Sequence, residues 1–361
     1  MPPATEIGTF DYLDTQDVEC LMIRQHCNGL LLLGEEEVRV LNPATRQWAC
    51  LPPPPPMCTP GMEDIYDVNL EDRCTDCHEQ YLVFDPTESP YYEVFLVRCV
   101  PWIPSPDSYH LVAPHIAERE WPPSTFVLLV LSSRTNRWEE RPFVRQGEAA
   151  RTIGYMLEAF PSEHPYAVYW RGSIYIRRFD FVMRISLSSH KYQVIELPES
   201  LRRNWYCLRL GKSENGVYCA LHGRDVPGLQ IWYLDETCYE INWMLKCDVN
   251  LHPLLANFSW EHSDSPSSVQ CANCNEDDRS NATCIQDGSG RSHIRYPLLG
   301  FHPNKNIAFF HTPLKRVLAY YFDSSKIEDF GCLPMEPQDR IYLSFPYTPL
   351  SDKRHFKQQV A

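Results

Sequence analysis

The stretch YAVYWRGSIYIRRFDFVMRISLSSHKYQVIELP, from Tyr166 to Pro198, contains four short apolar segments in succession. Each segment is rich in Val, Ile, Tyr or Phe and is bounded by turn residues, a pattern that is typical of β-strands. Arg171-Gly172 separates the first two segments, and a short polar turn separates the last two. We therefore predict two consecutive hairpins that form one four-stranded antiparallel unit.

The same strand–turn–strand pattern recurs along the chain, with turns that contain Asn, Asp, Ser or Pro, the residues that favour them. It is found at Val38–Pro52, Tyr81–Val97, Phe126–Phe143, Leu229–Leu245 and Arg316–Pro334. A second pair of strands precedes several of these hairpins. Examples are the pair around Asn215-Gly216, a strong turn signal, and the pair formed by Leu298–Phe301 and Ile307–Phe310.

A repeated unit of about 40–60 residues made of antiparallel strands is typical of a β-propeller. One small sheet cannot cover both of its faces, whereas radially stacked sheets cover one another. We predict an all-β, kelch-like β-propeller with six blades, or alternatively five, over residues 18–350. Residues 1–17 and 351–361 are predicted tails, and a strand around Arg340–Tyr347 is predicted to close the ring on the first blade.

Two segments interrupt the repeat. Cys99–Ser124 is a long Pro-rich connection, and short helical turns are expected only near Leu111–Glu120 and Leu201–Cys207. Residues 261–290 are polar, acidic and poor in apolar side chains. Such a segment cannot bury enough surface to order itself, so we predict a disordered insert between blades.

The composition bounds the class of partner. The 361-residue chain is 43% hydrophobic, contains 31 Pro against 15 Gly and carries a net charge of −14. This charge argues against nucleic acid or an anionic membrane as a partner, because both require a basic surface. No apolar run approaches the roughly 20 residues of a membrane span, and no secretory signal is recognised. We expect a cytoplasmic or nuclear protein, or both, with mostly reduced cysteines.

Several motifs, taken in order, carry a resemblance to a known family. Cys27–Leu31, Asn42–Arg46 and Leu51-Pro52 resemble the Cys-Asn-Gly-Leu-Leu, Asn-Pro-x-Thr-Arg and Leu-Pro motifs of the plant F-box-associated domain. The segment FDPTESPYYEVFLV, the pair IWYLDE and INWMLK, and the closing YTPLSD at Tyr347–Asp352 are similar to later motifs of that family. The resemblance covers nearly all of Val18–Leu350 and is greatest to the grass branch.

The resemblance implies the substrate-recognition domain of a Skp1–cullin–F-box ubiquitin ligase, which takes part in protein ubiquitination. Its propeller would hold an unidentified target protein, and an F-box would hold Skp1. No F-box precedes Val18 in this chain. We therefore expect a non-catalytic protein–protein interaction module that binds Skp1 only if the full-length protein contains an F-box.

Metal binding is the sharpest alternative. Cys74, Cys77 and His78 form one Cys-x2-Cys cluster, and Cys271 and Cys274, followed by Cys284, form another. Zinc sites pair such motifs over about 12–20 residues, whereas these two are far apart in the sequence, so only the fold could bring them together. We assign no metal, cofactor-binding or catalytic residue and expect no cofactor.

The second class of function that remains open is a metal- or carboxylate-dependent propeller enzyme. It would need acidic side chains that converge on one site. The run Glu35-Glu36-Glu37 is more simply a solvated turn, and motifs of nucleophilic or phosphate-binding enzymes are absent. Tryptophans recur at equivalent places of the repeats, where they could pack between blades or anchor a partner. They are Trp48, Trp138, Trp170, Trp232 and Trp243.

Overall fold

A computed structural model of the chain describes fifteen segments of it. They are residues 23–34, 37–55, 78–100, 112–158, 167–202, 208–213, 216–222, 228–237, 241–250, 284–286, 292–294, 298–312, 316–333, 344 and 347–351. The chain divides into two compact units. Unit 1 is Met1–Ile176, Met183–Val194 and Tyr347–Ala361, and unit 2 is Arg177–Val182 and Ile195–Pro346.

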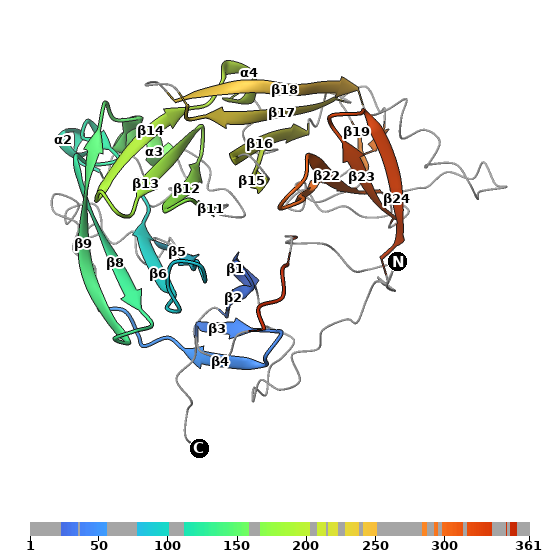
Figure 1. The fold of residues 1–361 in the computed structure, drawn as a ribbon. Helices are drawn as coiled ribbons and strands as arrows, with labels where there is room; N and C mark the ends of the chain where they lie inside the picture. Colours follow the sequence, from blue (N-terminus) through green and yellow to red (C-terminus); the bar gives the residue numbers. More distant parts are fainter. Residues whose placement is uncertain are drawn as a thin grey trace. The chain divides into compact units, whose positions relative to one another are not determined.

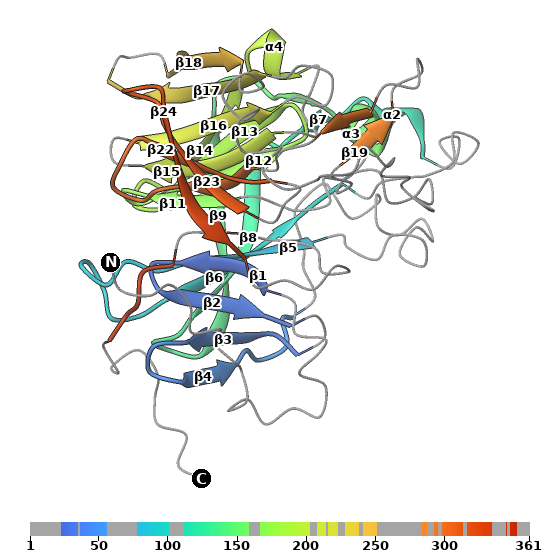
Figure 2. The same cartoon turned by 90° about the vertical axis from the view of Figure 1, so that its right-hand side faces the viewer.

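All six predicted hairpins are present, and the two additional strand pairs named above are present as well. The first sheet runs in the order β1 (Ile23–Cys27), β2 (Leu30–Leu33), β3 (Arg39–Asn42) and β4 (Gln47–Cys50). Each strand pairs antiparallel with the next one along the chain, as Figure 2 shows in blue. This four-stranded meander is the kind of unit that forms a propeller blade.

The second and third meanders are joined in one eight-stranded sheet. The second runs β5 (His78–Val83), β6 (Glu93–Arg98), β8 (Thr125–Ser132) and β9 (Arg137–Gln146). The third runs β11 (Ala167–Trp170), β12 (Ser173–Arg178), β13 (Phe181–Ser186) and β14 (Lys191–Glu196). Strands β9 and β14 pair in parallel, with Lys191 opposite Val144 and Gln193 opposite Gln146.

Unit 2 contains two further meanders. One runs β15 (Leu208–Ser213), β16 (Gly216–His222), β17 (Gly228–Asp235) and β18 (Asn242–Asn250). The other runs β21 (Leu298–Phe301), β22 (Ile307–His311), β23 (Arg316–Tyr321) and β24 (Lys326–Cys332). Figure 1 shows the first of these in yellow-green to amber and the second in orange to red.

The predicted fold class, all-β and built of repeated propeller-type blades, is confirmed by these sheets. Within the described residues the four-stranded meanders number five, the smaller of the two predicted blade counts. The hairpins predicted at Tyr81–Val97 and Phe126–Phe143 share one meander, because β6 pairs with β8 through Glu93 opposite Ser132.

The remaining elements are short. Helices α2 (Pro114–Ala117) and α4 (Glu199–Arg202) fall within or beside the two segments predicted to hold helical turns, and α3 (Ile153–Glu158) was not predicted. Strands β7 (Glu120–Trp121) and β10 (Arg151–Thr152) form a small separate sheet. Of the insert predicted at 261–290, only Cys284–Gln286 are described; they form β19, which pairs with β20 (Ser292–Ile294).

Burial follows the position of each strand in its meander. All four residues of β2 are buried, as are all six of β12, so both faces of these strands are covered. The fourth strands are less buried: β4, β18 and β24 contain no fully buried residue, β9 has one, Phe143, and β14 has two, Tyr192 and Ile195. The apolar runs of the sequence therefore mark the covered strands, and the more polar fourth strands are more exposed.

A four-residue turn precedes the fourth strand in four of the five meanders. In each, the last turn residue has a positive φ: 57° at Arg46, 55° at Asn136, 53° at His190 and 52° at Ser325. A left-handed residue at this place is typical of hairpin turns whose twist matches that of the flanking strands. The repeat is thus structural as well as compositional.

The C-terminal segment lies against the first sheet of unit 1. The side-chain amide of Asn42 donates a 2.9 Å hydrogen bond to the carbonyl oxygen of Leu350. A Cβ atom at Gly29 would lie 2.7 Å from the carbonyl oxygen of Thr348. Residues 347–351 form no strand here, and residues 340–343, 345 and 346 of the predicted closing strand lie outside the described residues.

Candidate interaction site

Two turns meet at one end of the β5-β6-β8-β9 meander. The β5–β6 connection ends at Tyr92, and the β8–β9 turn begins after Ser132. Because Glu93 and Ser132 face each other on adjacent antiparallel strands, both connections leave the sheet at the same end. We call Asp85–Tyr92 and Ser132–Asn136 together the paired-turn site.

Asp85 folds the first turn. Its carboxylate accepts hydrogen bonds from the backbone nitrogen of Thr87 at 3.0 Å and from the Thr87 hydroxyl at 2.6 Å. The Asp85 carbonyl accepts the backbone nitrogens of Glu88 and Ser89 at 3.1 and 2.9 Å. The Ser89 hydroxyl then accepts the backbone nitrogen of Tyr91 at 3.1 Å. These local bonds are the reason Asp and Ser favour turns, and they fix the backbone that carries Tyr91.

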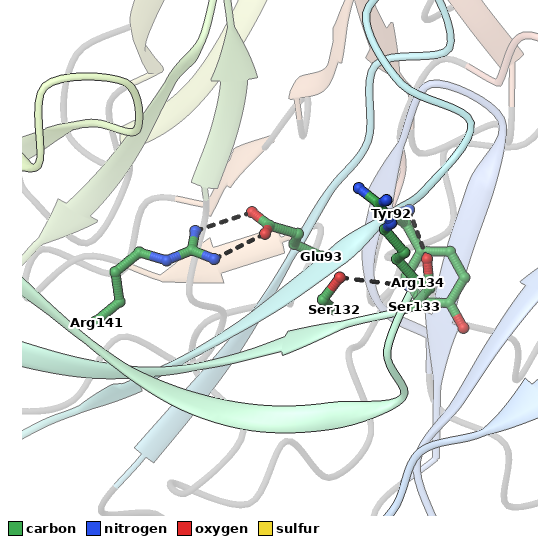
Figure 3. A network of polar contacts seen from close by, with 6 residues as sticks. All are labelled: Tyr92, Glu93, Ser132, Ser133, Arg134 and Arg141. Atoms are coloured by element: carbon green, nitrogen blue, oxygen red, sulfur yellow. Dashed lines mark hydrogen bonds and ion pairs between the residues drawn. The ribbon is translucent and has the colours of Figure 1, made fainter.

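Ser133 fastens the second turn to the first, and Ser132 braces the second turn itself, as Figure 3 shows. The Ser133 hydroxyl accepts the backbone nitrogen of Tyr92 at 2.9 Å, and the Ser133 nitrogen donates to the Tyr92 carbonyl at 3.0 Å. The Ser132 hydroxyl accepts the backbone nitrogen of Arg134 at 3.3 Å. Burial raises the pKa of Tyr92 to about 12, so this phenol stays neutral at the base of the site.

An ion pair supports the strands behind the turns. Arg141 on β9 donates two hydrogen bonds, of 3.1 and 2.8 Å, to the carboxylate of Glu93 on β6 (Figure 3). The guanidinium carbon also lies 5.6 Å from the ring centre of Phe95. Both charged side chains are about three-quarters buried. A bidentate pair in this setting has specific geometry, so it holds β6 and β9 in register across β8.

The outer side of the paired-turn site presents an aromatic residue with an arginine. Tyr91 is 40% exposed, and the guanidinium of Arg134 lies 5.8 Å from its ring centre. Tyrosine and arginine are enriched among the residues that dominate protein–protein binding energies. Because the backbones of both turns are already fixed, binding a partner would cost little further loss of conformational entropy in these turns.

The site is also anchored to the first sheet of unit 1. The buried thiol of Cys27 lies 3.3 Å from both the carbonyl oxygen and the backbone nitrogen of Phe84, and Asn28 donates to that oxygen at 2.7 Å. Just after the other turn, the indole nitrogen of Trp138 on β9 donates to the carbonyl of Pro52 at 2.8 Å. The Cys-Asn-Gly and Leu-Pro motifs therefore position this site by holding its two flanks.

The five recurring tryptophans are divided between the two units and make local contacts there. All five are partly exposed, so none is a fully buried packing residue. Trp138 is bonded to Pro52, Arg39 lies 5.3 Å from the Trp48 ring and Arg171 lies 4.5 Å from the Trp170 ring. Trp232 and Trp243 lie on the adjacent strands β17 and β18 of unit 2.

The predicted metal clusters cannot be placed. Cys74, Cys77, Cys271 and Cys274 lie outside the described residues, and His78 is the first residue of β5. Within the described segments, no three His, Cys, Asp or Glu side chains are grouped as metal ligands. Asp235 and Glu328 have lowered pKa values, Asp235 because Thr237 bonds it and Glu328 because Lys326 and Tyr321 bond it. Both carboxylates are thus held ionised in local contacts.

Sequence reasoning did not single out Tyr91 or Arg134. A usable signal was present: an aromatic residue and an arginine stand in turns where small polar residues are expected. The structure brings these two turns together, and the sequence pattern alone does not predict that they meet.

Comparisons with known proteins assign no family. No family model and no curated protein matches this sequence. Solved structures with distant similarity include YCF48 from Cyanidioschyzon merolae, at 8% identity and a TM-score of 0.34 over 86% of this chain and 85% of that chain. The computationally designed Ika8 protein is 10% identical, with a TM-score of 0.29 over 88% and 89% of the two chains.

A third similar structure is the extracellular domain of the putative hybrid two component system BT3049 from B. thetaiotaomicron. It is 10% identical, with a TM-score of 0.26 over 86% of this chain and 34% of that chain. Scores of this size transfer no activity, ligand or partner to this protein. In the described part of the chain, no helix combines the length and apolarity of a membrane span.

Proposed function

We propose that this chain is a non-catalytic protein-interaction module that binds a partner protein through the paired-turn site. The observation that carries the proposal is the exposed pair of Tyr91 and Arg134 on two turns that are bonded to each other. A tyrosine and an arginine, two residue types enriched in binding hot spots, are thereby held on a pre-formed backbone. The reaction class is binding alone, with no bond made or broken.

The electrostatics of the site favour a protein over a nucleic acid as the partner. The chain has a net charge of −14, and the paired-turn site carries Asp85 and Glu88 as well as Arg134. A phosphate backbone requires several cations in a row, whereas a protein surface can complement a mixed pattern of charge.

The resemblance to the plant F-box-associated domain gives the proposal its cellular setting. On this interpretation, the bound partner is a target for ubiquitination, and Skp1 is a second partner only if the full-length protein contains an F-box. The motif residues Cys27, Asn28 and Asn42 hold the sheet and its neighbours together. They support the binding surface without forming it, so their presence is compatible with many different targets.

Affinity capture with variants tests the proposal. Tyr91→Ala should weaken capture of the partner by about tenfold or more, the scale of a hot-spot tyrosine. Tyr155→Ala is a matched control, because Tyr155 is 41% exposed and Arg151 lies 5.4 Å from its ring centre. Proteins captured from an extract of the source organism are quantified by mass spectrometry, and the direct affinity of the strongest hit is then measured with purified components.

The two outcomes are distinct. The proposal predicts that at least one protein is captured by both wild type and Tyr155→Ala. The same protein should be lost from Tyr91→Ala and from Arg134→Gln. If the Tyr91→Ala chain keeps every protein that wild type binds, the paired-turn site is not the binding surface. Purified chain mixed with Skp1 alone is expected to show no heat of binding in calorimetry, because the site proposed here serves the target.

A further inference from the structure

An exposed cysteine stands directly opposite an arginine in two separate sheets. In the first sheet, Cys50 ends β4 and pairs with Arg39 on β3. In the last sheet, Cys332 ends β24 and pairs with Arg316 on β23. Side chains directly opposite on antiparallel strands lie on the same face with Cβ atoms about 5 Å apart. Both thiols are exposed and unoxidised.

At Cys332 the contact is direct. A terminal nitrogen of Arg316 lies 3.7 Å from the Cys332 sulfur, within hydrogen-bonding distance for sulfur. The Nε atom of Arg316 donates to Asp329 at 2.6 Å. The guanidinium is therefore shared between a carboxylate and a thiol. The pKa of Arg316 is raised, mostly by Asp329 and further by Cys332.

At Cys50 the arginine is more deeply buried. The Arg39 side chain is only 9% exposed, and its Nε atom is buried with no hydrogen-bond partner among the described residues. Its terminal nitrogen donates to Glu37 at 2.7 Å, but the Glu37 side chain is 75% exposed. Burial acts to lower the pKa of Arg39, yet bonds from Cys50 and Glu37 outweigh it and the pKa is raised.

Three of the other described cysteines lie in more buried surroundings. Cys27 and Cys219 are buried, and burial raises the pKa of Cys219 to about 12. Burial also raises the pKa of the half-buried Cys247. A thiol in an apolar setting stays protonated and unreactive, whereas a nearby guanidinium stabilises the thiolate that attacks. The described cysteines named here therefore fall into two groups: buried or half-buried thiols, and exposed thiols opposite an arginine.

We propose that Cys50 and Cys332 are thiol modification sites that form mixed disulfides with a small anionic disulfide of the glutathione type. The cysteine thiolate attacks one sulfur of the disulfide, and a new sulfur–sulfur bond forms as the old one breaks. The departing half leaves as a thiolate and takes up the proton that the cysteine released. The protein thiol is oxidised by the disulfide, and no other reactant is required.

The arginines have two parts in this reaction. Each guanidinium stabilises the attacking thiolate, and each attracts the carboxylates of the incoming disulfide. Asp329 and Glu37 compete for the same guanidinium groups, so they restrain the reaction. Neutralising an arginine and neutralising its carboxylate partner should therefore change the rate in opposite directions.

The test follows the full chain at pH 7 in the presence of oxidised glutathione. Samples are quenched at intervals, digested and quantified by mass spectrometry at the peptide of each cysteine. Cys50 and Cys332 should be modified before Cys27 and Cys219. Arg316→Gln should slow the modification of Cys332 by about threefold, while Asp329→Asn and Glu37→Gln should speed Cys332 and Cys50 respectively by a similar factor.

Lys326→Gln is the matched control. This variant removes one positive charge from the same pair of strands. Lys326 lies at the opposite end of β24 from Cys332 and donates a hydrogen bond to Glu328. Its Cys332 rate should equal that of wild type. With a neutral disulfide such as hydroxyethyl disulfide, the loss caused by Arg316→Gln should be smaller. Unchanged Cys332 rates in both Arg316→Gln and Asp329→Asn would overturn the proposal and leave Cys332 an ordinary surface thiol.

Discussion

The side-chain amide of Asn28 donates a 2.7 Å hydrogen bond to the backbone carbonyl of Phe84, which joins the turn between β1 and β2 to the end of β5. Asn28 also has a φ of 43°, a conformation that Asn tolerates better than most residues. One residue thus combines a tight turn with a bond between two sheets.

Removing the Asn28 side chain should destabilise unit 1. We expect Asn28→Ala to lower the free energy of unfolding by about 1–2 kcal/mol, because the bond is lost and Ala fits a positive φ poorly. Asn28→Gly loses the same bond but accepts the positive φ, so it should cost less. Urea denaturation followed by circular dichroism measures both. Equal losses would mean that the backbone conformation contributes nothing.

Gly29 should be intolerant of any side chain. Its φ is 92°, and an added Cβ would meet the Thr348 oxygen and the Leu350 Cβ, each at 2.7 Å. Gly29→Ala should therefore release the segment around Thr348–Leu350 and expose it to proteases. Gly172→Ala is the control, since its φ of 72° is also positive but its Cβ would meet nothing within 4 Å. Cleavage after residue 346 that rises equally in both variants would contradict the proposed contact.

Gly211 should be required for packing inside unit 2. A Cβ there would lie 2.5 Å from the Phe301 ring, which also packs 5.8 Å from Tyr218 between ring centres. We expect Gly211→Ala to cost about 1–3 kcal/mol as an overpacked site. Phe301→Leu should also destabilise the chain by itself. The double variant should lose less free energy of unfolding than the sum of the two single losses. The leucine side chain has no ring and leaves room for the added Cβ at position 211. Strict additivity in thermal denaturation would show that the two residues do not clash.

Buried Cys219 should make the stability of unit 2 depend on alkaline pH. Its thiol has a pKa of about 12 in the folded chain because burial disfavours the thiolate, against an ordinary value of 9.0. A group with a raised pKa contributes its full stabilisation below the ordinary value and loses it as the pH rises. Stability should therefore fall between about pH 9 and pH 12, and the fall should be less steep in Cys219→Ala. Denaturant midpoints at several pH values measure it, and parallel slopes in the two proteins would contradict it.

The sequence pattern predicted the local structure well and the distant pairing less well. Each hairpin, such as that at Arg171-Gly172, is specified by apolar runs and turn residues within about 15 positions. The pairing of Glu93 with Ser132 crosses the long Pro-rich connection, and that of Lys191 with Val144 is parallel. Such registers depend on tertiary packing, which the pattern of one strand does not contain.

The candidate sites likewise depend on contacts between residues that are distant in the sequence. Tyr91 and Arg134 meet only because two turns 41 positions apart are bonded through Tyr92 and Ser133. The exposed thiols of Cys50 and Cys332 could be counted in the sequence, but their arginine partners follow from strand register. The Cys-x2-Cys motifs that the sequence did single out remain a prediction outside the described residues.

The parallel pairing of β9 with β14 has a consequence for the repeat as a unit of evolution and engineering. A blade that contacts its neighbours only through side chains can be duplicated or deleted. Its removal exposes no new unpaired strand edge on the neighbouring blades. Here the backbone of Val144–Gln146 is hydrogen-bonded to the next blade, so deletion of that blade would leave an unpaired strand edge open to aggregation. The second and third blades of this chain must therefore be inherited, moved or redesigned together.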